Sequence, residues 1–582
     1  MSGVHEEAET PHRPRAKPPK KAERLSLLHS FRLIEQSLAE PSPAHHPLAK
    51  VSLFLAKVEP LANGAQLVLE NSGRKIAYSR LCVTDATGKE QNTYMITRRK
   101  FVKNAGTLAG GVVAAGLTGC AGIHSGASRK KSDIRIEHIS FGYDEDIFRA
   151  PVGFAGAVVD RATRVTVRCS VRTAGGKVSI GFGTMPFNHT FSFPSKKLTS
   201  ENKNDAMKAL ATELAKVTGS YQEFDHPIEI NWDLAPLYLK AAAEVSERLR
   251  LADAIPKLCT LVTAAAFDAA IHDAFGKANQ INCFDTYGPE FMNHDLSRYL
   301  GAGFKGRYPG DYLLRQHKPR MTLCHLVSAV DPIEDFENKK PLKDGLPETL
   351  AEWINYNGLL ELKIKVNGTD LKWDLERVMH IDKVTTQTQE KRGVKNWAYV
   401  LDFNEKCPNV DYFIQFCRQL KEKMPMGYQR IKYTEQPTAR DLKAHPENAM
   451  HEAAKLCPVV IDESLIDVDS LLLARDMGWT GAVVKSPKGL SHMILMASVA
   501  GKEKIFLAGG DMSCPGAALI QTANLQARVP TITSVEANAR QYLPQANNAW
   551  ESRFPGMFRV TDGMLQTREI NGPGLGVPET ET

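Results

Sequence analysis

Short apolar runs alternate with longer amphipathic segments from Arg320 onward, and this alternation constrains the fold more than any other feature of the chain. The apolar runs have the length of buried strands, and the longer segments space their apolar residues as helices do. Strand and helix follow each other about eight times. This pattern favours a parallel, TIM-like (β/α) barrel over an open sheet, and we assign it to residues 320–540. The expected strands are 321–327, 360–366, 398–403, 430–434, 459–461, 482–484, 505–508 and 531–535, and the expected helices are 347–356, 373–389, 410–423, 468–477, 490–500 and 517–527.

The stretch before the barrel has a different pattern. Residues 134–139 and 164–171 alternate as half-buried strands do, and Gly175-Gly176 before 178–183 fits a hairpin turn. Strands followed by helices indicate an α+β domain over residues 133–319. A segment rich in Gly and Tyr, 279–320, lacks periodicity and is expected to be a long loop. The expected helices of this domain are 205–217, 237–251 and 261–277.

Charged residues stand where five of the barrel strands are expected to end. Active sites of (β/α) barrels lie at the carboxyl ends of the strands, so these side chains are candidates for one site. They are Lys363 and Lys365, Asp402 with Asn404, Glu435, Asp462 with Glu463, and Lys485.

Three of these residues, Asp402, Glu435 and Asp462, are carboxylates on successive strands, each about one β/α unit from the next. A single acid at a strand end is better explained as a solvated side chain. Three that converge offer the oxygen ligands that a hard divalent cation prefers, which predicts Mg²⁺, with Mn²⁺ as an alternative.

The lysines suit proton transfer. Lys363 and Lys365 are two apart, so on a strand they point to the same face, which is the interior of a barrel. There the two ammonium groups are expected to lower each other's pKa, and a lysine with a lowered pKa can act as a base. Lys485 ends a later strand and is expected to lie across the barrel from Lys365.

These motifs resemble those of the enolase superfamily, and more narrowly its mandelate racemase and muconate lactonizing branch. The resemblance covers residues 133–577 and includes a C-terminal return, 541–577, to the capping domain formed by 133–319. It implies that Mg²⁺ binds the substrate carboxylate and stabilises the enediolate formed when the α-proton leaves, with Lys365 and Lys485 as the two bases and Lys363 as a supporting charge. Residues around 148–154 and 183–193 are expected to close over the substrate. Asn404, Asp511 and Glu536 are the expected substrate-binding residues.

The sequence departs from the family's motifs at three places, and these differences limit which of the family's reactions can be expected. A single glycine, Gly489, follows Lys485 where relatives commonly have a pair. The seventh strand end carries Asp511 and Met512 but no histidine, so the His–Asp dyad of the mandelate racemase type is absent. The eighth carries Glu536 where dipeptide epimerases have two aspartates; Glu536 could bind a substrate amine or form a salt bridge.

The leading interpretation is a racemase, epimerase or cycloisomerase that acts on a small-molecule carboxylate. A sugar-acid dehydratase is the first alternative, and a non-catalytic, lipid-anchored carboxylate-binding protein is the second. The resemblance also implies a homo-oligomer.

The net charge of +7 gathers largely in the first hundred residues, so nucleic-acid binding has no support. Ten scattered cysteines without a Cys-x-x-Cys pair predict mostly buried free thiols.

Residues 95–120 resemble a twin-arginine export signal with a lipobox. Arg98 and Arg99 precede a short apolar run, and Cys120 would be lipidated. Such signals belong at the start of a chain, so we expect synthesis to begin at Met95 and residues 1–94 to be a disordered or mis-annotated leader. The protein would then be periplasmic, with the membrane contacted only through a lipid anchor, and otherwise cytoplasmic.

Overall fold

A computed structural model describes residues 66–70, 78–84, 90–97 and 129–577. The chain divides into two units, Met1–Ile123 and His124–Thr582. The first unit has an antiparallel sheet in the order β1 (Gln66–Glu70), β2 (Tyr78–Thr84) and β3 (Glu90–Thr97). Strands therefore occur where the sequence predicted a leader without regular structure, because their apolar runs are too short to establish a periodicity. Met95 lies in β3, whereas Arg98, Arg99 and Cys120 lie outside the described residues.

The second unit begins with an antiparallel sheet covered by helices. Its strands pair in the order β4-β5-β6. Strand β4 is longer than expected, because the exposed acids in its middle interrupt the apolar alternation while its pairing with β5 continues almost to the hairpin tip. This domain consists of β4 (Ile134–Phe154), β5 (Ala157–Thr173), β6 (Val178–Phe187), α4 (His189–Ser192), α5 (Ser200–Gly219), α6 (Pro227–Arg248) and α7 (Lys257–Asn279).

Helix α7 packs directly on β5 and β6. A Cβ atom added to Gly183 would lie 2.1 Å from the carbonyl oxygen of Ala266, so only glycine allows this approach. Of the helices that the structure describes, only α7 has the length and composition to cross a membrane, and it is almost wholly buried as a core helix. The segment after it, expected as a loop, contains only short elements: η2 (Cys283–Thr286), α8 (Ser297–Leu300), η3 (Ala302–Phe304) and η4 (Pro309–Asp311).

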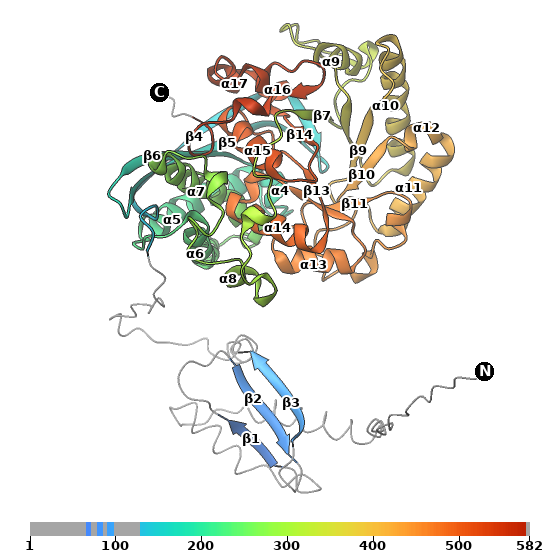
Figure 1. The fold of residues 1–582 in the computed structure, drawn as a ribbon. Coiled ribbons are helices and arrows are strands. Elements are labelled where there is room, and N and C mark those ends of the chain that lie inside the picture. The colour runs from blue at the N-terminus through green and yellow to red at the C-terminus, as the bar shows by residue number, and fades with distance from the viewer. Residues whose placement is uncertain (1–65, 71–77, 85–89, 98–128, 578–582) are drawn as a thin grey trace, which may run out of the picture. The chain divides into compact units, whose positions relative to one another are not determined.

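Eight parallel strands then form the barrel, which confirms the predicted fold class (Figure 1). The ladder runs in the order β13-β12-β11-β10-β9-β8-β7-β14, and Gly509 of β13 lies against the carbonyl of Ser534 in β14. The strands are β7 (Met321–Val327), β8 (Glu361–Lys365), β9 (Ala398–Asp402), β10 (Ile431–Glu435), β11 (Val459–Ile461), β12 (Gly481–Val484), β13 (Phe506–Gly509) and β14 (Ser534–Glu536). The elements between them are η5 (Asp335–Glu337), α9 (Leu350–Asn357), α10 (Leu371–Lys391), α11 (Val410–Lys423), α12 (Pro425–Tyr428), η6 (Pro446–Asn448), η7 (Ala453–Lys455), α13 (Val468–Asp476), η8 (Ser486–Lys488), α14 (Leu490–Glu503) and α15 (Ala517–Arg528).

The C-terminal segment returns to the first domain. Strand β15 (Met564–Leu565) pairs with β7, and the amide of Leu575 donates to Oδ1 of Asp273 in α7 at 2.9 Å. The other elements here are α16 (Ala539–Tyr542), α17 (Pro544–Glu551), α18 (Pro555–Phe558) and η9 (Thr567–Glu569).

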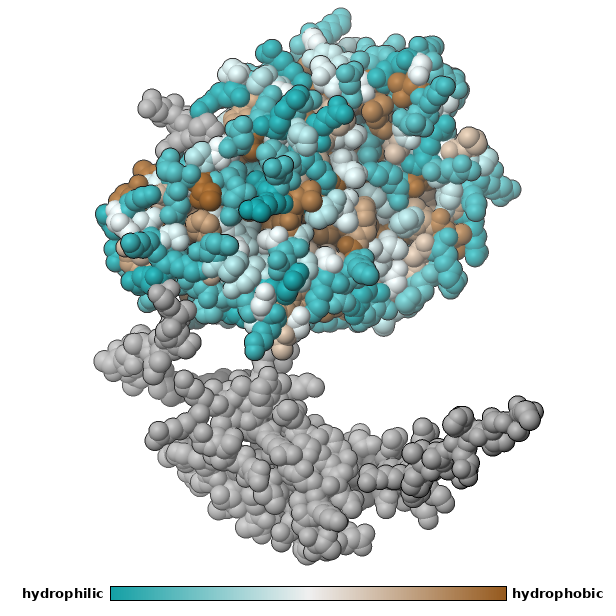
Figure 2. Space-filling model, viewed as in Figure 1, coloured by the Kyte–Doolittle hydropathy of each residue, from teal (hydrophilic) through white to brown (hydrophobic). Residues whose placement is uncertain are grey.

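Apolar side chains fill the barrel interior below the strand ends. They are Cys324, Val400, Tyr433, Val460, Val483 and Ala508. All eight cysteines between residues 129 and 577 are buried free thiols, as predicted. On the face of the second unit that Figure 2 shows, hydrophilic residues cover most of the surface. Because the interior is packed, an open site can form only at the strand ends.

Candidate active site

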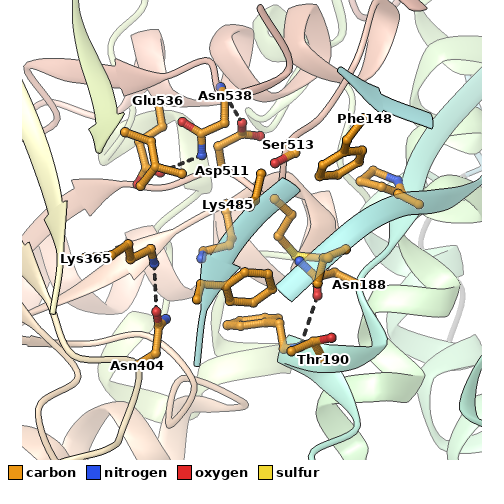
Figure 3. A pocket seen from close by; sticks show the side chains of 18 of the residues that line it. Phe148, Asn188, Thr190, Lys365, Asn404, Lys485, Asp511, Ser513, Glu536 and Asn538 are labelled. Carbon is orange, nitrogen blue, oxygen red and sulfur yellow. Dashed lines mark hydrogen bonds between the residues drawn. The ribbon is translucent and has the colours of Figure 1, made fainter. Parts of the chain in front are cut away.

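A pocket lies between the carboxyl ends of the barrel strands and the β4–β5 hairpin of the first domain (Figure 3). Its floor is charged, and the wall from the first domain combines four phenylalanines with polar residues that include Arg161, Asn188, His189 and Thr190. The structure places in one lining eight of the nine predicted catalytic, metal and substrate-binding residues: Lys363, Lys365, Asn404, Glu435, Asp462, Lys485, Asp511 and Glu536. The ninth, Asp402, is fully buried directly beneath, against Lys363 and Lys365.

Lys363 is the centre of the floor. Its ammonium lies 2.8 Å from Glu435, 2.8 Å from Glu536 and 3.1 Å from Asp402, and its side chain is buried. These carboxylates come from β10, β14 and β9, so one lysine of β8 connects four strands. The sequence left open whether Glu536 binds a substrate amine or forms a salt bridge. In the structure it forms a salt bridge with Lys363.

Lys365 reaches the same carboxylate from the neighbouring side. Its ammonium contacts Oδ2 of Asp402 and donates to Oδ1 of Asn404 at 2.9 Å (Figure 3). Asn404 has a φ of 44°, a left-handed conformation that asparagine tolerates better than most residues. The main-chain N–H of Asn404 donates to Oδ1 of Asp402 at 2.9 Å. Asn404 therefore holds both Lys365 and Asp402.

Lys485 lies on the far side of the pocket, on a strand separated from β8 by three others. It donates to Oδ2 of Asp462 at 2.5 Å, and its ammonium lies 4.6 Å from the centre of the Phe191 ring. A second lysine, Lys488, contacts Oδ1 of Asp462 at 2.8 Å. Asp462 is therefore held by two cations.

The carboxyl groups of this floor have divergent acidities. Burial opposes ionisation of Asp402, but Lys365 and Lys363 outweigh it and bring its pKa to about 2. Burial likewise opposes ionisation of Asp462, and Lys485 and Lys488 outweigh it, so its pKa is lowered. Burial, together with the charge of Asp402, raises the pKa of Glu435 well above its usual range. Burial and Asp462 raise the pKa of Glu463 to about 7.

The expected lowering of the pKa of Lys363 is not found, and the pKa of Lys485, for which no shift was predicted, is raised. Burial favours their neutral forms, but the surrounding carboxylates outweigh it and raise both pKa values above the ordinary range. The predicted lowering rested on the repulsion between Lys363 and Lys365 and on a nearby cation. The structure adds Glu435 and Glu536 beside Lys363, and Asp462 beside Lys485.

The ends of β13 and β14 form a polar corner of the pocket. The amide nitrogen of Asn538 donates to Asp511 at 3.0 Å, and its side chain donates to Glu536 at 3.1 Å (Figure 3). Burial and the charge of Glu536 raise the pKa of Asp511. This corner has acceptors for the N–H groups of a ligand.

The first domain supplies the aromatic wall. Phe148 and Phe154 come from β4, and Phe187 and Phe191 follow from β6 and α4. Phe148 stacks on Tyr542, which fastens the hairpin to the barrel mouth. The structure thus places both expected closing segments against the pocket.

The acidic residues suit a divalent cation in charge and in donor type. The site has six buried carboxyl groups and four buried lysines: Asp402, Glu435, Asp462, Glu463, Asp511 and Glu536, and Lys363, Lys365, Lys485 and Lys488. Atom Oε1 of Glu435 is buried and accepts no hydrogen bond from any described residue. As they stand, however, no three Asp, Glu, His or Cys side chains in the described ranges converge closely enough to hold an ion. Lys363 lies among them, so an ion would compete with its ammonium for Asp402 and Glu435.

Three residues of this site had no predicted catalytic, metal-binding or substrate-binding role. Gln436, with a φ of 32°, accepts from the amides of Asp462 and Ser464 at 2.8 and 3.2 Å. Glu463 accepts from Asn404 at 3.2 Å. Lys488 stands three residues after Lys485 in a stretch that is otherwise nearly uncharged, and that isolated charge was the signal available in the sequence.

A known protein family matches the part of the chain that forms most of the barrel. Residues 346–581 match the family described as enolase C-terminal domain-like. No curated protein matches the chain significantly by sequence.

Solved structures of the same architecture cover most of the chain. A dipeptide epimerase from Enterococcus faecalis V583, complexed with Mg and the dipeptide L-Leu-L-Tyr, is 15% identical, with a TM-score of 0.50 over 76% of this chain and 99% of that one. The L-Ala-D/L-Glu epimerase from Bacillus subtilis is 16% identical, with a TM-score of 0.50 over 76% and 98%. An N-succinyl Arg/Lys racemase from Bacillus cereus ATCC 14579 is 17% identical, with a TM-score of 0.50 over 77% and 96%.

The fold and the pocket define a capped (β/α) barrel with lysines and carboxylates at its mouth. The barrel part of this chain, residues 346–581, matches the enolase C-terminal domain-like family, and the solved structures share the capped-barrel fold.

Proposed function

We propose that this protein is a Mg²⁺-dependent enzyme that removes the proton α to a carboxylate, giving an enediolate that leads to racemisation, epimerisation or cycloisomerisation. The observation that carries the proposal is the placing of Lys365 and Lys485 on opposite sides of one pocket, with Asp402, Glu435 and Asp462 between them. Two bases on opposite sides can remove a proton from one face of a carbon and return it to the other.

Asp402, Glu435 and Asp462 would hold the ion, with Mn²⁺ as an alternative to Mg²⁺. When bound, it would supply positive charge that stabilises the negative charge developing on the substrate carboxylate. Lys365 would take the α-proton, and Lys485 would deliver or remove a proton on the opposite face. Lys363 keeps its positive charge and holds Glu435 and Glu536 in place. The phenylalanine wall would exclude water from the reacting carbon.

The pocket favours a small carboxylate with an apolar group against Phe148, Phe154 and Phe191. The corner formed by Asp511 and Glu536 would accept N–H groups of such a substrate. The neighbouring structure from Enterococcus faecalis was solved with the dipeptide L-Leu-L-Tyr, which supports dipeptides as the first compounds to test.

Solvent deuterium exchange into the α-position of candidate acids and dipeptides tests the proposal. Exchange is expected with Mg²⁺, and either Lys365→Ala or Lys485→Ala should abolish exchange at one face or both. The control is Lys372→Ala, because Lys372 is exposed on α10. Full retention of exchange in Lys365→Ala or in Lys485→Ala would remove that lysine from the mechanism. A product of unchanged mass supports isomerisation, whereas loss of water would favour the dehydratase.

Export through the twin-arginine-like segment, with lipid attachment at Cys120, is a second proposal. It is supported by the order of Arg98, Arg99 and Cys120 along the sequence. The intact mass of the native protein tests it, since a mature chain that retains residues 1–94 contradicts export from Met95. Self-association, also proposed, is measured by sedimentation.

A further inference from the structure

Lys488 is a buried cation outside the lining of the pocket. It ends η8, the turn that follows β12, and its side chain is fully buried. Its ammonium makes two contacts with one residue: Oδ1 of Asp462 at 2.8 Å and the main-chain oxygen of Asp462 at 2.5 Å. A cation held by both groups of one aspartate restricts the rotation of that carboxylate.

The two lysines on Asp462 differ in what they can do. Lys485 lines the pocket and contacts only Oδ2 of the carboxylate, so it is placed to leave Asp462 when a ligand enters. Lys488 is not part of the pocket lining and is also bonded to the main-chain oxygen of Asp462; its ammonium lies 5.7 Å from the centre of the Phe191 ring. Oδ1 lies 2.8 Å from the Lys488 ammonium without accepting a hydrogen bond, whereas Oδ2 accepts from Lys485, the lysine that lines the pocket.

The turn that carries Lys488 is itself fastened to the first domain. Gly489 follows it with a φ of 94°, and helix α14 begins directly afterwards. At that helix start, the amide and hydroxyl of Ser491 donate to the two oxygens of Asp268 in α7, each at 2.8 Å. Lys488 is therefore fixed by the packing of α7 against the barrel, and not by the contents of the pocket.

We propose that Lys488 is a positioning residue that holds the Asp462 carboxylate from outside the pocket lining, so that one oxygen faces the pocket for a divalent cation while Lys485 remains free for proton transfer. This inference rests on the proposed function, because it assumes that Asp462 is a metal ligand. Partners that orient metal ligands without touching the metal commonly change metal affinity by about 10- to 100-fold when they are removed.

The test is the dissociation constant of Mg²⁺, measured by calorimetry on the full chain without substrate, and of Mn²⁺, measured by the electron paramagnetic resonance of the free ion. Lys488→Met should raise both constants by about 10- to 100-fold. In an Asp462→Asn background, Lys488→Met should cause no further change, because the carboxylate that it positions has gone.

Lys277→Met is the matched control. Lys277 also pairs with a fully buried aspartate, Asp273, at 2.7 Å and lies 4.9 Å from a phenylalanine ring, but it is in α7 outside the pocket. Unchanged affinity in Lys488→Met, an equal rise in Lys277→Met, or an additive effect on top of Asp462→Asn overturns the positioning role. If the unmodified chain binds neither ion, the proposed function fails and this inference fails with it; if it binds them normally, only the inference is at stake.

Discussion

The Nζ atom of Lys363 lies 2.8 Å from Oε1 of Glu536, so an ion pair joins the second and eighth strands of the barrel at its mouth. Strand β7 runs between those strands, and the pair spans it from inside. The same ammonium also contacts Asp402 and Glu435. The Lys363 side chain thus connects Glu536 of β14 to Asp402 and Glu435 of β9 and β10.

Lys363→Met should therefore destabilise the fold strongly. Removing the lysine leaves Glu435, Glu536 and Asp402 buried without this cation, and breaking a buried ion pair typically costs about 3–5 kcal/mol. The free energy of unfolding in denaturant measures the loss. Adding Glu536→Gln should recover part of it, because one of the uncompensated charges is then removed. The exposed control Lys372→Met should change stability by less than about 0.5 kcal/mol; a similarly small loss for Lys363→Met contradicts the account.

The barrel and the position of its site could be predicted from sequence because both depend on local signals. Strand 459–461 and helix 410–423 agree with β11 and α11 to the residue, since Pro458 precedes the strand and Asn409 caps the helix. Helix α6 was predicted to start at Leu237 but starts ten residues earlier, at Pro227, because Pro236 inside it resembles a boundary.

The partnerships within the site could not be predicted in the same way. Which carboxylate Lys363 contacts depends on the stagger of β8, β10 and β14, which no single stretch of sequence contains. The roles of Gln436 and Lys488 depend on hydrogen bonds between neighbouring strand ends. The ion pairs of Lys363 with Glu435, Glu536 and Asp402 raise its pKa, where the sequence predicted a lowering.

Metal removal should stop the reaction. Dialysis against a chelator is expected to abolish deuterium exchange, and added Mg²⁺ should restore it, because the substrate's developing charge then has its counterion. Glu435→Gln should weaken Mg²⁺ binding by more than about 100-fold, since losing a direct ligand exceeds the usual cost of losing an outer partner.

Glu361→Gln is the control for that change. Glu361 is a buried carboxylate on β8, like Glu435 on β10, but it begins its strand and pairs with Lys432 and Ser534 at the other end of the barrel. Its replacement should leave the affinity for Mg²⁺ unchanged. Equal weakening by both variants would show that general damage to the barrel, and not a lost ligand, is being measured.

Gly181→Ala should destabilise the first domain. A Cβ atom at this position would lie 2.0 Å from the backbone nitrogen of Ala274 in α7, and backbone cannot move aside as a flexible side chain does. Overpacking of a core typically costs about 1–3 kcal/mol, and the loss here should be at the upper end or beyond. Thermal unfolding measures it. Gly142→Ala in β4 is the control, because an added Cβ meets nothing within 4 Å there. Equal melting temperatures for the two variants would contradict the packing of α7 on β6.

Acid should destabilise the protein partly through His325. This residue lies in β7, is 3% exposed and packs 5.2 Å from the ring of Trp353. Burial, helped by the charge of Arg540, lowers its pKa to about 3. Because the folded pKa lies below the unfolded value, the unfolded chain binds the proton first as pH falls below about 6.5. Each pH unit between about 6.5 and 3 should then cost ~1.4 kcal/mol of stability.

His325→Phe isolates that contribution, because phenylalanine fills the buried position and does not titrate. The free energy of unfolding, measured in denaturant from pH 7 to pH 4, should fall less steeply in the variant than in the parent. The difference in slope is the quantity to compare, since the substitution also changes stability at pH 7 through packing alone. The matched control is His445→Phe, which removes an imidazole that is 44% exposed at the surface beside Glu447. A parent and a His325→Phe variant with parallel curves over this range would show that His325 is protonated in the folded protein, and that the burial of β7 against Trp353 does not exclude the proton.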